Sequence, residues 1–218
     1  MCYYISNGQY HRLQLAPSFE AQRELPNSTV CSIIRQFPRL QALDLPYRRY
    51  ISSEDEPHAP PIILSSLTKL TLRLHSYSSL AGSQMLEALV LPNLTCLCLM
   101  GNWNPNTFRW ILSLLVHARS NFELSKLTFG HHTAEFIDDD MWREIIRFLK
   151  AFPTISELSF RYRYLFPNAE TILTRLAEET TMVPNLKVLI LPNHNYFSIS
   201  KKCLLVLANS RPDIYLEY

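Results

Sequence analysis

A short leucine pattern, L-x-x-L-x-L, recurs at nearly regular intervals along the chain. The clearest copies lie in LPNLTCLCLMGN, residues 91–102, and VPNLKVLILPNHN, residues 183–195. Six copies follow one another at intervals of 27 to 31 residues, and a period of this size indicates a chain of stacked structural units. The triplets are Leu40, Leu43 and Leu45; Leu67, Leu70 and Leu72; Leu94, Leu97 and Leu99; Leu124, Leu127 and Phe129; Ile155, Leu158 and Phe160; and Leu186, Leu189 and Leu191, flanked by Leu13 with Leu15 and by Ile214 with Leu216.

Each triplet is typical of a short strand with one apolar face. In the clearest copy Leu97 and Leu99 alternate with two cysteines, so both leucines point to the same side of the strand. Leu94, three residues earlier, is expected to fill the same interior where the chain turns into the strand. A proline precedes the first residue of four triplets by two positions and suits the start of a strand, since its φ is fixed and it has no N–H: Pro38, Pro92, Pro153 and Pro184.

Segments with helical periodicity lie between the triplets. Residues 106–118 place Phe108 and Ile111 on one face, with Asn106 or Thr107 as N-cap. Residues 138–152 begin with three aspartates at the positive end of the helix dipole. Residues 45–64, which are basic, then acidic, then proline-rich, are expected to form a protruding or disordered loop. The expected helices span 28–37, 83–90, 106–118, 138–152, 168–179 and 198–210, the last with Leu204, Leu205 and Leu207 toward the core.

This alternation of strand, loop and helix predicts an α/β fold whose parallel sheet has all its helices on one side. One unit cannot bury its apolar side alone, whereas stacked copies can. An ordinary doubly wound α/β domain is the alternative, because its units are also about 30 residues long. The strands of that fold are usually continuous runs of Val and Ile, unlike the brief leucine triplets.

The composition is typical of a soluble globular chain. Hydrophobic residues make up 47% of the 218 residues, and the net charge of +2 gives no general attraction to nucleic acid or anionic lipid. No apolar run reaches the roughly 18 residues of a membrane span. The five cysteines form no disulfide pattern, and residues 1–14 lack the features of a signal peptide. We therefore expect a protein of the cytoplasm or nucleus, with no membrane association.

The triplets and their intervening helices resemble leucine-rich repeats of the ribonuclease-inhibitor type. The phrases FPRLQALDLP, LPNLTCLCLMGN and VPNLKVLILP are similar to the C-terminal repeat region of fungal F-box proteins. This resemblance covers roughly residues 10–218. It implies a single leucine-rich-repeat solenoid, residues 1–218, with about seven to eight irregular repeats, a curved parallel sheet on the concave face and helices on the convex face. The asparagine that follows the strand in such repeats is recognisable at Asn102 and Asn193.

No F-box is recognisable before the first full triplet. Leu25-Pro26 matches the usual opening of that helical module, but the sequence then runs directly into the triplet at Leu40. Solenoid ends need polar caps, whereas residues 3–5 and 214–216 are apolar and aromatic. We therefore expect a fragment lacking an N-terminal cap or F-box, or a chain that associates through its ends.

Side chains between the leucines are expected to project from the concave face, the usual contact surface of such solenoids. RYRYLFP, residues 161–167, adds the arginine and aromatic side chains that are common at protein-binding hot spots. Similar mixtures stack on single-stranded nucleic acid, but the balanced net charge favours a protein partner. The candidate partner-binding residues are Lys69, Arg73, Cys96, Cys98, Met100, Lys126, Glu157, Arg161, Tyr162, Arg163 and Tyr164.

Metal binding and catalysis have little support in the sequence. Cys96 and Cys98 form a C-x-C without the second ligand pair that zinc needs, so a packed pair of thiols is the better interpretation. His131 and His132 are neighbours on an extended segment and point opposite ways, and the following aspartates suit a helix start. No motif of a known nucleophile or phosphate site is present. We expect no enzyme activity, no metal and no cofactor.

The sequence thus predicts a protein–protein interaction module, which the family resemblance extends to the substrate-recognition part of an F-box-type ubiquitin ligase. A Skp-type adaptor would be a further partner if an F-box lies upstream. One alternative is a regulator of a small GTPase, acting through Arg161 or Asn102 on the loop rim. Another is a truncated repeat fragment without independent activity.

Overall fold

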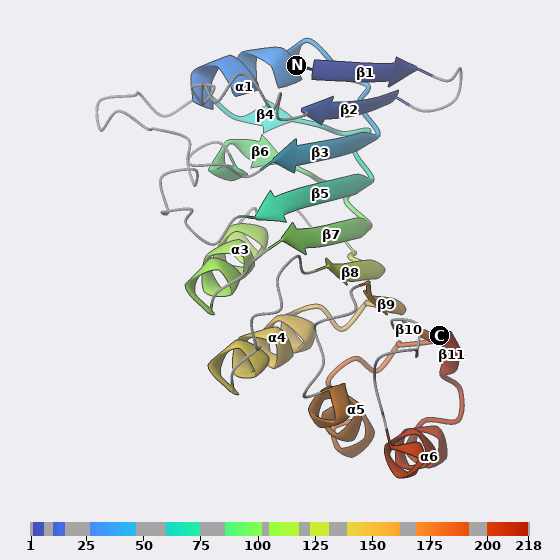
Figure 1. Cartoon of the computed structure of the whole chain (residues 1–218). Helices are drawn as coiled ribbons and strands as arrows, with labels where there is room; N and C mark the ends of the chain where they lie inside the picture. Colours follow the sequence, from blue (N-terminus) through green and yellow to red (C-terminus); the bar gives the residue numbers. More distant parts are fainter. Residues whose placement is uncertain are drawn as a thin grey trace.

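The computed structural model describes residues 2–6, 11–15, 27–46, 60–74, 86–101, 105–117, 123–130, 139–161, 169–191 and 200–217. Within these residues the chain is α/β, and its main sheet has nine strands (Figure 1). Their order in the sheet follows their order in the sequence. The strands are β1 (Cys2–Ser6), β2 (His11–Leu15), β3 (Ala42–Pro46), β5 (Lys69–Leu74), β7 (Cys96–Gly101), β8 (Lys126–Gly130), β9 (Glu157–Phe160), β10 (Val188–Ile190) and β11 (Tyr215–Glu217).

From β2 to β11 every pair of neighbouring strands is parallel, as the sequence predicts. Only β1 is antiparallel to its neighbour β2. The central triplet position is in register from strand to strand: Leu70 lies beside Leu97, and Leu97 lies beside Leu127. The flanking copies belong to the same stack, because Leu13 pairs with Leu43 and Leu216 pairs with Leu189.

All eighteen side chains of the six triplets are buried, and they belong to one continuous core. The third triplet position becomes aromatic toward the C-terminus, where Phe129 stacks on Phe160 with ring centroids 5.5 Å apart. Phe108 and Phe148 from neighbouring helices pack edge to face 6.0 Å apart in the same layer. The prediction that the triplets share one interior is confirmed.

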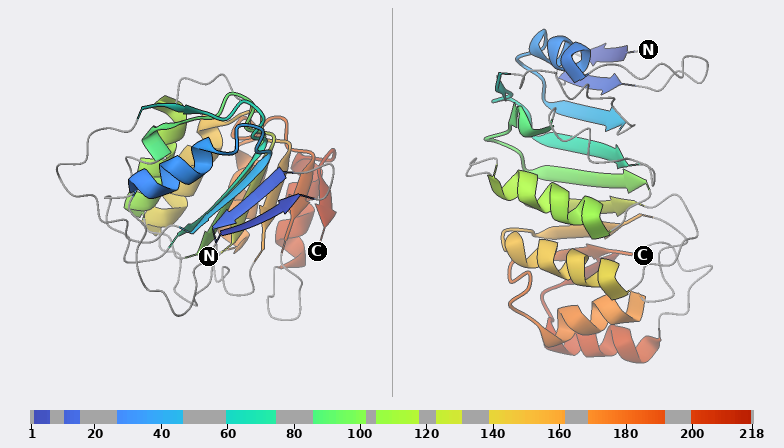
Figure 2. Two further views of the ribbon diagram at one scale, coloured as in Figure 1. Left: turned by 90° about the horizontal axis from the view of Figure 1, so that it is seen from above. Right: turned by 90° about the vertical axis from the view of Figure 1, so that its left-hand side faces the viewer.

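The described helices lie on one side of the sheet, along the outer side of its curve (Figures 1 and 2). Each turns its apolar stripe toward the leucines; in α4, for example, Trp142, Ile145, Phe148 and Leu149 are buried. The helices are α1 (Asn27–Arg35), α3 (Pro105–His117), α4 (Asp139–Ala151), α5 (Ala169–Glu178) and α6 (Lys201–Ser210).

Four local predictions were wrong. Residues 83–90 do not form a helix throughout, because Leu89–Val90 forms strand β6, which pairs in parallel with β4 (Ile62–Ile63) on the helix side of the main sheet (Figure 1). β4 also replaces the end of the expected loop at residues 45–64. Helix α3 begins at Pro105, before either predicted N-cap, since proline suits the first helical position. In α6 the buried residues are Cys203 and Leu207, while Leu205 is 53% exposed.

The recurrent proline occupies the second position of a tight turn rather than the start of the strand itself. In the turn at residues 91–94, the N–H of Leu94 donates to the carbonyl of Leu91. Equivalent bonds join Leu40 to Phe37, Ile155 to Phe152 and Leu186 to Val183. Proline is favoured at this position because its fixed φ matches the turn. The turn therefore delivers the first residue of each triplet into the core.

A ladder of hydroxyl groups, not predicted from the sequence, links successive turns. Thr68, Thr95, Ser125 and Ser156 each follow the first residue of a triplet. Each hydroxyl donates to the carbonyl of the equivalent residue one unit earlier, at 3.2 to 3.3 Å. The same carbonyl also accepts two backbone N–H groups from the next unit. These four residues, called the hydroxyl ladder below, hold adjacent units in register.

Replacing Thr95 by valine is expected to lower the free energy of unfolding by about 1 kcal/mol, the usual net value of one hydrogen bond. Valine keeps the shape of threonine, so the loss reports the hydroxyl alone. Urea denaturation followed by circular dichroism measures it. Thr180→Val, at an exposed position outside the ladder, is the matched control. Equal stability of the two variants would contradict a role for the ladder.

No helix among the described residues is long and apolar enough to cross a membrane.

Candidate binding face of the sheet

The side chains that alternate with the core leucines project from the sheet away from the helices. In β5 to β9 they form three rows across the strands, and together they are called the open face below. The first row is Lys69, Cys96, Lys126 and Glu157; the second is Thr71, Cys98, Thr128 and Ser159, continued by Asp44 in β3; the third is Arg73, Met100, Gly130 and, directly after β9, Arg161.

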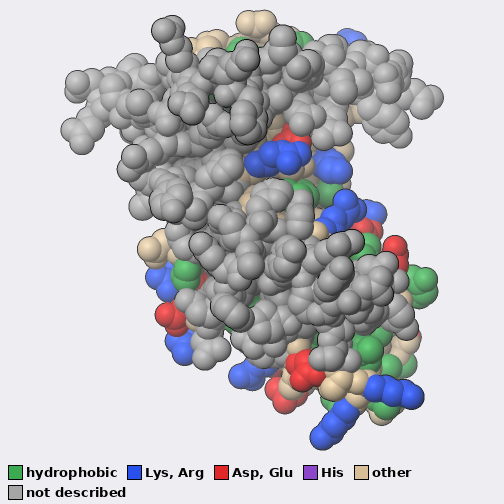
Figure 3. Space-filling model, in the orientation of Figure 1, with side chains coloured by type: hydrophobic (Ala, Val, Ile, Leu, Met, Phe, Trp, Pro, Cys, Tyr) green, Lys and Arg blue, Asp and Glu red, His purple; other side chains and the backbone are tan. Residues whose placement is uncertain are grey.

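The first row is an accessible part of the open face. Lys69 and Lys126 are exposed, and Cys96 lies half-buried between them. The ammonium of Lys126 donates to Glu157 Oε2 at 2.6 Å across β8 and β9. This hydrogen bond raises the pKa of Lys126, so its small contribution to stability is lost only as the pH rises through that raised value. Lys and Arg side chains are visible over the middle strands in Figure 3.

The second row is buried except for the half-buried Cys98, in contrast to the expected projection of every alternate side chain into solvent. Asp44 is 2% exposed and Ser159 is 1% exposed, and Thr71 and Thr128 are also buried. Thr71, Thr128 and Ser159 are each shorter than a lysine or arginine side chain two residues away in the sequence. The contact surface available to a partner is therefore narrower than predicted, and it consists mainly of the first and third rows.

Asp44 and Arg73 form a two-pronged ion pair on the open face. Arg73 Nε and Nη2 donate to the two carboxylate oxygens of Asp44, both at 2.8 Å. The carboxylate is almost fully buried, whereas the Arg73 side chain is 37% exposed. This two-pronged geometry is the strong form of an arginine–carboxylate pair. It joins β3 to β5 and keeps one edge of the guanidinium at the surface.

Cys96 and Cys98 are both half-buried and carry no disulfide. Burial raises the pKa of each thiol above its ordinary value, and it outweighs the opposite effect of Lys69. Both cysteines are therefore thiols near neutral pH, and the thiolate is the form that attacks electrophiles and binds metals. Among the described residues no group of three or more potential metal ligands occurs.

Alkylation of these two thiols by iodoacetamide at pH 8 is expected to be several times slower in the folded chain than in urea. The physical reason is the raised pKa together with limited access. The folded-state rate should climb as the pH passes 9. Mass spectrometry of the peptide that contains both cysteines measures the rates. Equal rates in the folded chain and in urea would contradict the raised pKa values and the limited access of the two thiols.

Comparison with protein-family models and with curated protein sequences gave no match.

Several candidate residues lie outside the described part of the chain. They include three of the eleven partner-binding candidates, two histidines considered as ligands and two asparagines considered as repeat markers: Tyr162, Arg163, Tyr164, His131, His132, Asn102 and Asn193. The other eight partner-binding candidates belong to the three rows defined above. The structure therefore brings Lys69, Cys96, Lys126 and Glu157 side by side, and it places Arg73, Met100 and Arg161 along the next accessible row.

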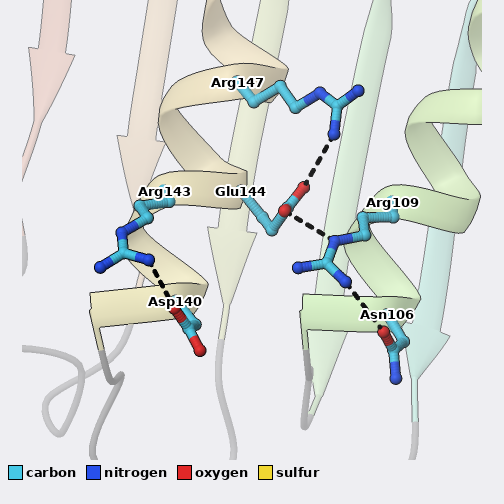
Figure 4. Close-up of polar contacts among 6 residues, drawn as sticks. All are labelled: Asn106, Arg109, Asp140, Arg143, Glu144 and Arg147. Carbon is cyan, nitrogen blue, oxygen red and sulfur yellow. Dashed lines mark hydrogen bonds and ion pairs between the residues drawn. The ribbon is translucent and has the colours of Figure 1, made fainter.

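A second polar cluster lies on the helix side, between α3 and α4 (Figure 4). Arg109 Nε donates to Glu144 Oε1 at 2.7 Å, and Arg147 approaches the other carboxylate oxygen at 4.0 Å. Glu144 is buried although glutamate is normally a surface residue. Asn106 supports Arg109, and Asp140 pairs with Arg143 within α4. The Arg109–Glu144 pair ties α3 to α4, the other contacts lie within one helix, and the whole cluster lies away from the open face.

Proposed function

We propose that the chain is a leucine-rich-repeat solenoid that binds another protein on the open face and has no enzymatic activity. The in-register triplets, the repeated turns and the hydroxyl ladder support the solenoid assignment, because each unit makes the same contacts with the next one. Helices cover one side of the sheet, so its other side is the surface on which the units can act together.

The observation that carries this proposal is the first row of the open face. Three neighbouring strands place Lys69, Cys96 and Lys126 side by side although they are 27 and 30 residues apart in the sequence. A rigid sheet fixes their spacing, which lowers the entropic cost of binding. The protonated thiol between the two lysines adds a soft, uncharged contact. Such a row suits an extended protein segment that runs across the strands.

The resemblance to F-box proteins extends the proposal to a ubiquitin ligase. In that role the open face would hold the substrate, and a separate module would recruit a Skp-type adaptor. Tagging the endogenous protein at its C-terminus and purifying it should then recover that adaptor. Recovery of partners without an adaptor would remove the ligase role and leave protein binding intact.

Charge reversal on the open face tests the binding proposal. Three forms of the protein are immobilised and exposed to extract from the source cells: wild type, the face variant Lys69→Glu/Lys126→Glu and the control Lys201→Glu/Lys202→Glu. The control changes the charge equally, at two exposed residues of α6. We expect at least one protein to be retained by wild type and control but lost by the face variant. The same retained set on all three would overturn the proposal.

A further inference from the structure

We propose that the open face recognises an acidic protein segment whose carboxylates are spaced three residues apart and contact Lys69 and Lys126. This inference rests on the proposed function and adds the chemical class of the partner and its spacing. Three features of the open face support it: its charge balance, the position of its cations relative to Cys96, and the distance between strands.

The described open face has an excess of positive charge. From β3 to β9 it contains four cations, Lys69, Arg73, Lys126 and Arg161, and two carboxylates, Asp44 and Glu157, so its net charge is 4 − 2 = +2. Asp44 is bonded to Arg73, and Glu157 is bonded to Lys126. Lys69 and Arg161 are exposed, and neither side chain has a hydrogen bond or ion pair within the described residues. The charge that the face can offer to a partner is therefore positive.

Three of these cations surround the same point of the sheet. Lys69 and Lys126 flank Cys96 in register on β5 and β8. Lys69, Lys126 and Arg161 all act on the Cys96 thiol and oppose the effect of burial on its pKa, whereas Glu157 alone among the nearby charges adds to that effect. Their fields consequently overlap above a half-buried, low-dielectric patch, where a carboxylate interacts more strongly than in bulk water.

The strand spacing sets the separation of the partner's acids. Neighbouring strands are about 4.8 Å apart, so the first-row positions of Lys69 and Lys126 lie about 9.6 Å apart. A polyproline II segment rises about 3.1 Å per residue with three residues per turn, so side chains at i and i+3 share one side and lie about 9.3 Å apart. An acid-x-x-acid segment in this conformation matches the two lysines. In a β-strand the i and i+2 side chains are only about 6.6 Å apart, which does not match.

A nucleic acid fits this surface less well than an acidic peptide. The Glu157 carboxylate lies among the cations of the first row, and a continuous phosphate backbone would be repelled there. Separate carboxylates can instead be placed at the cations alone.

Fluorescence anisotropy with labelled peptides tests the proposal. The acidic probe has four Glu-Pro-Pro repeats, and its control has four Gln-Pro-Pro repeats of the same conformation. A peptide with alternating Glu and Pro tests the spacing, and a twelve-nucleotide uridine strand tests the other class of polyanion. We expect the first probe to bind at least fivefold more tightly than each of the others. Binding should weaken between 0.1 and 1 M NaCl, where the Debye length falls from about 10 to about 3 Å.

Three variants connect this binding to the open face. Lys69→Glu/Lys126→Glu should weaken binding at least fivefold, and Lys201→Glu/Lys202→Glu should change it less than twofold. Glu157→Gln should strengthen it about twofold, because the hydrogen bond that now holds Lys126 is weakened; loss of folding cannot produce a gain. Circular dichroism melting curves verify that each variant is folded.

The proposal is overturned if the glutamine peptide or the uridine strand binds as well as the acidic probe. It is also overturned if the acidic probe does not bind, or if the variants of the open face leave its affinity unchanged. Retention of a cellular protein through the open face, together with failure of the acidic probe, would reject the acidic class while leaving the proposed function standing.

Discussion

Replacing Leu97 by alanine is expected to lower the free energy of unfolding by about 3 kcal/mol, within the range for a fully buried leucine. Leu97 has no exposed surface and lies between Leu70 and Leu127 in the sheet. Its removal leaves a cavity that the strand ladder on both sides prevents from closing. Each unit of a stacked array contacts mainly its neighbours. The defect in β7 is therefore also expected to weaken the coupling between the units before β7 and those after it.

Urea denaturation monitored by circular dichroism measures this loss, and the adjacent Cys96→Ala is the matched control. Cys96 is on the same strand but on the open face, half-buried, so its truncation should cost less than about 1 kcal/mol. We also expect the Leu97 variant to unfold over a broader urea range than wild type. Similar losses for the two variants would mean that the leucine row does not form the core.

Replacing Arg73 by methionine is expected to cost about 2 kcal/mol, because it leaves the buried Asp44 carboxylate without its two-pronged partner. Breaking a fully buried ion pair costs about 3–5 kcal/mol, and the smaller value expected here reflects the 37% exposure of the Arg73 side chain. The same denaturation experiment measures the loss. Lys69→Met, on the same strand and exposed, should change stability by less than about 0.5 kcal/mol.

A second substitution separates the carboxylate from the packing of the arginine. Asp44→Asn introduced together with Arg73→Met removes the buried charge, so the double variant should be more stable than Arg73→Met alone. If the double variant is the less stable of the two, the main role of Arg73 is packing rather than pairing with Asp44.

The repeating framework could be predicted because its cause is local. Apolar side chains at fixed spacing identify both the strands and the side that they bury, and Leu97 and Phe129 are buried as their triplet positions require. Parallel pairing of successive strands then follows from the regular return of the chain on the other side of the sheet, through a helix or through one of the short strands β4 and β6. The proline two residues before four of the triplets is a correct signal, although it acts through the turn bond to the first triplet residue.

The errors arose where distant segments decide local structure. Leu89 and Val90 have an apolar pattern that suits a helix, but pairing with Ile62 and Ile63 makes them a strand. Leu205 was placed in the core by periodicity, yet α6 is the last helix described, and its buried side is set by Cys203 and Leu207. Neither the strand that pairs with Leu89–Val90 nor the side of α6 that is buried can be identified from the local sequence alone.

The position of the candidate site was predictable from the sequence, but the burial and pairing of its side chains were not. Alternation along the strands correctly places Lys69 and Lys126 on the same face as Cys96. It does not reveal that Asp44 and Ser159 are buried, or that Lys126 is held by Glu157, since these depend on side chains from other strands. The hydroxyl ladder had a visible signal, namely Thr or Ser after the first residue of four successive triplets.

Methyl-to-methyl nuclear Overhauser effects in a leucine-labelled sample test the stacked arrangement most directly. We expect cross-peaks from Leu97 to both Leu70 and Leu127, and from Leu127 to Leu158, as the register requires. Leu70 and Leu158, which are three strands apart, should show none. Absence of the neighbouring cross-peaks, or broadening of these methyl signals by a soluble paramagnetic agent, would show that the leucines do not form one buried stack.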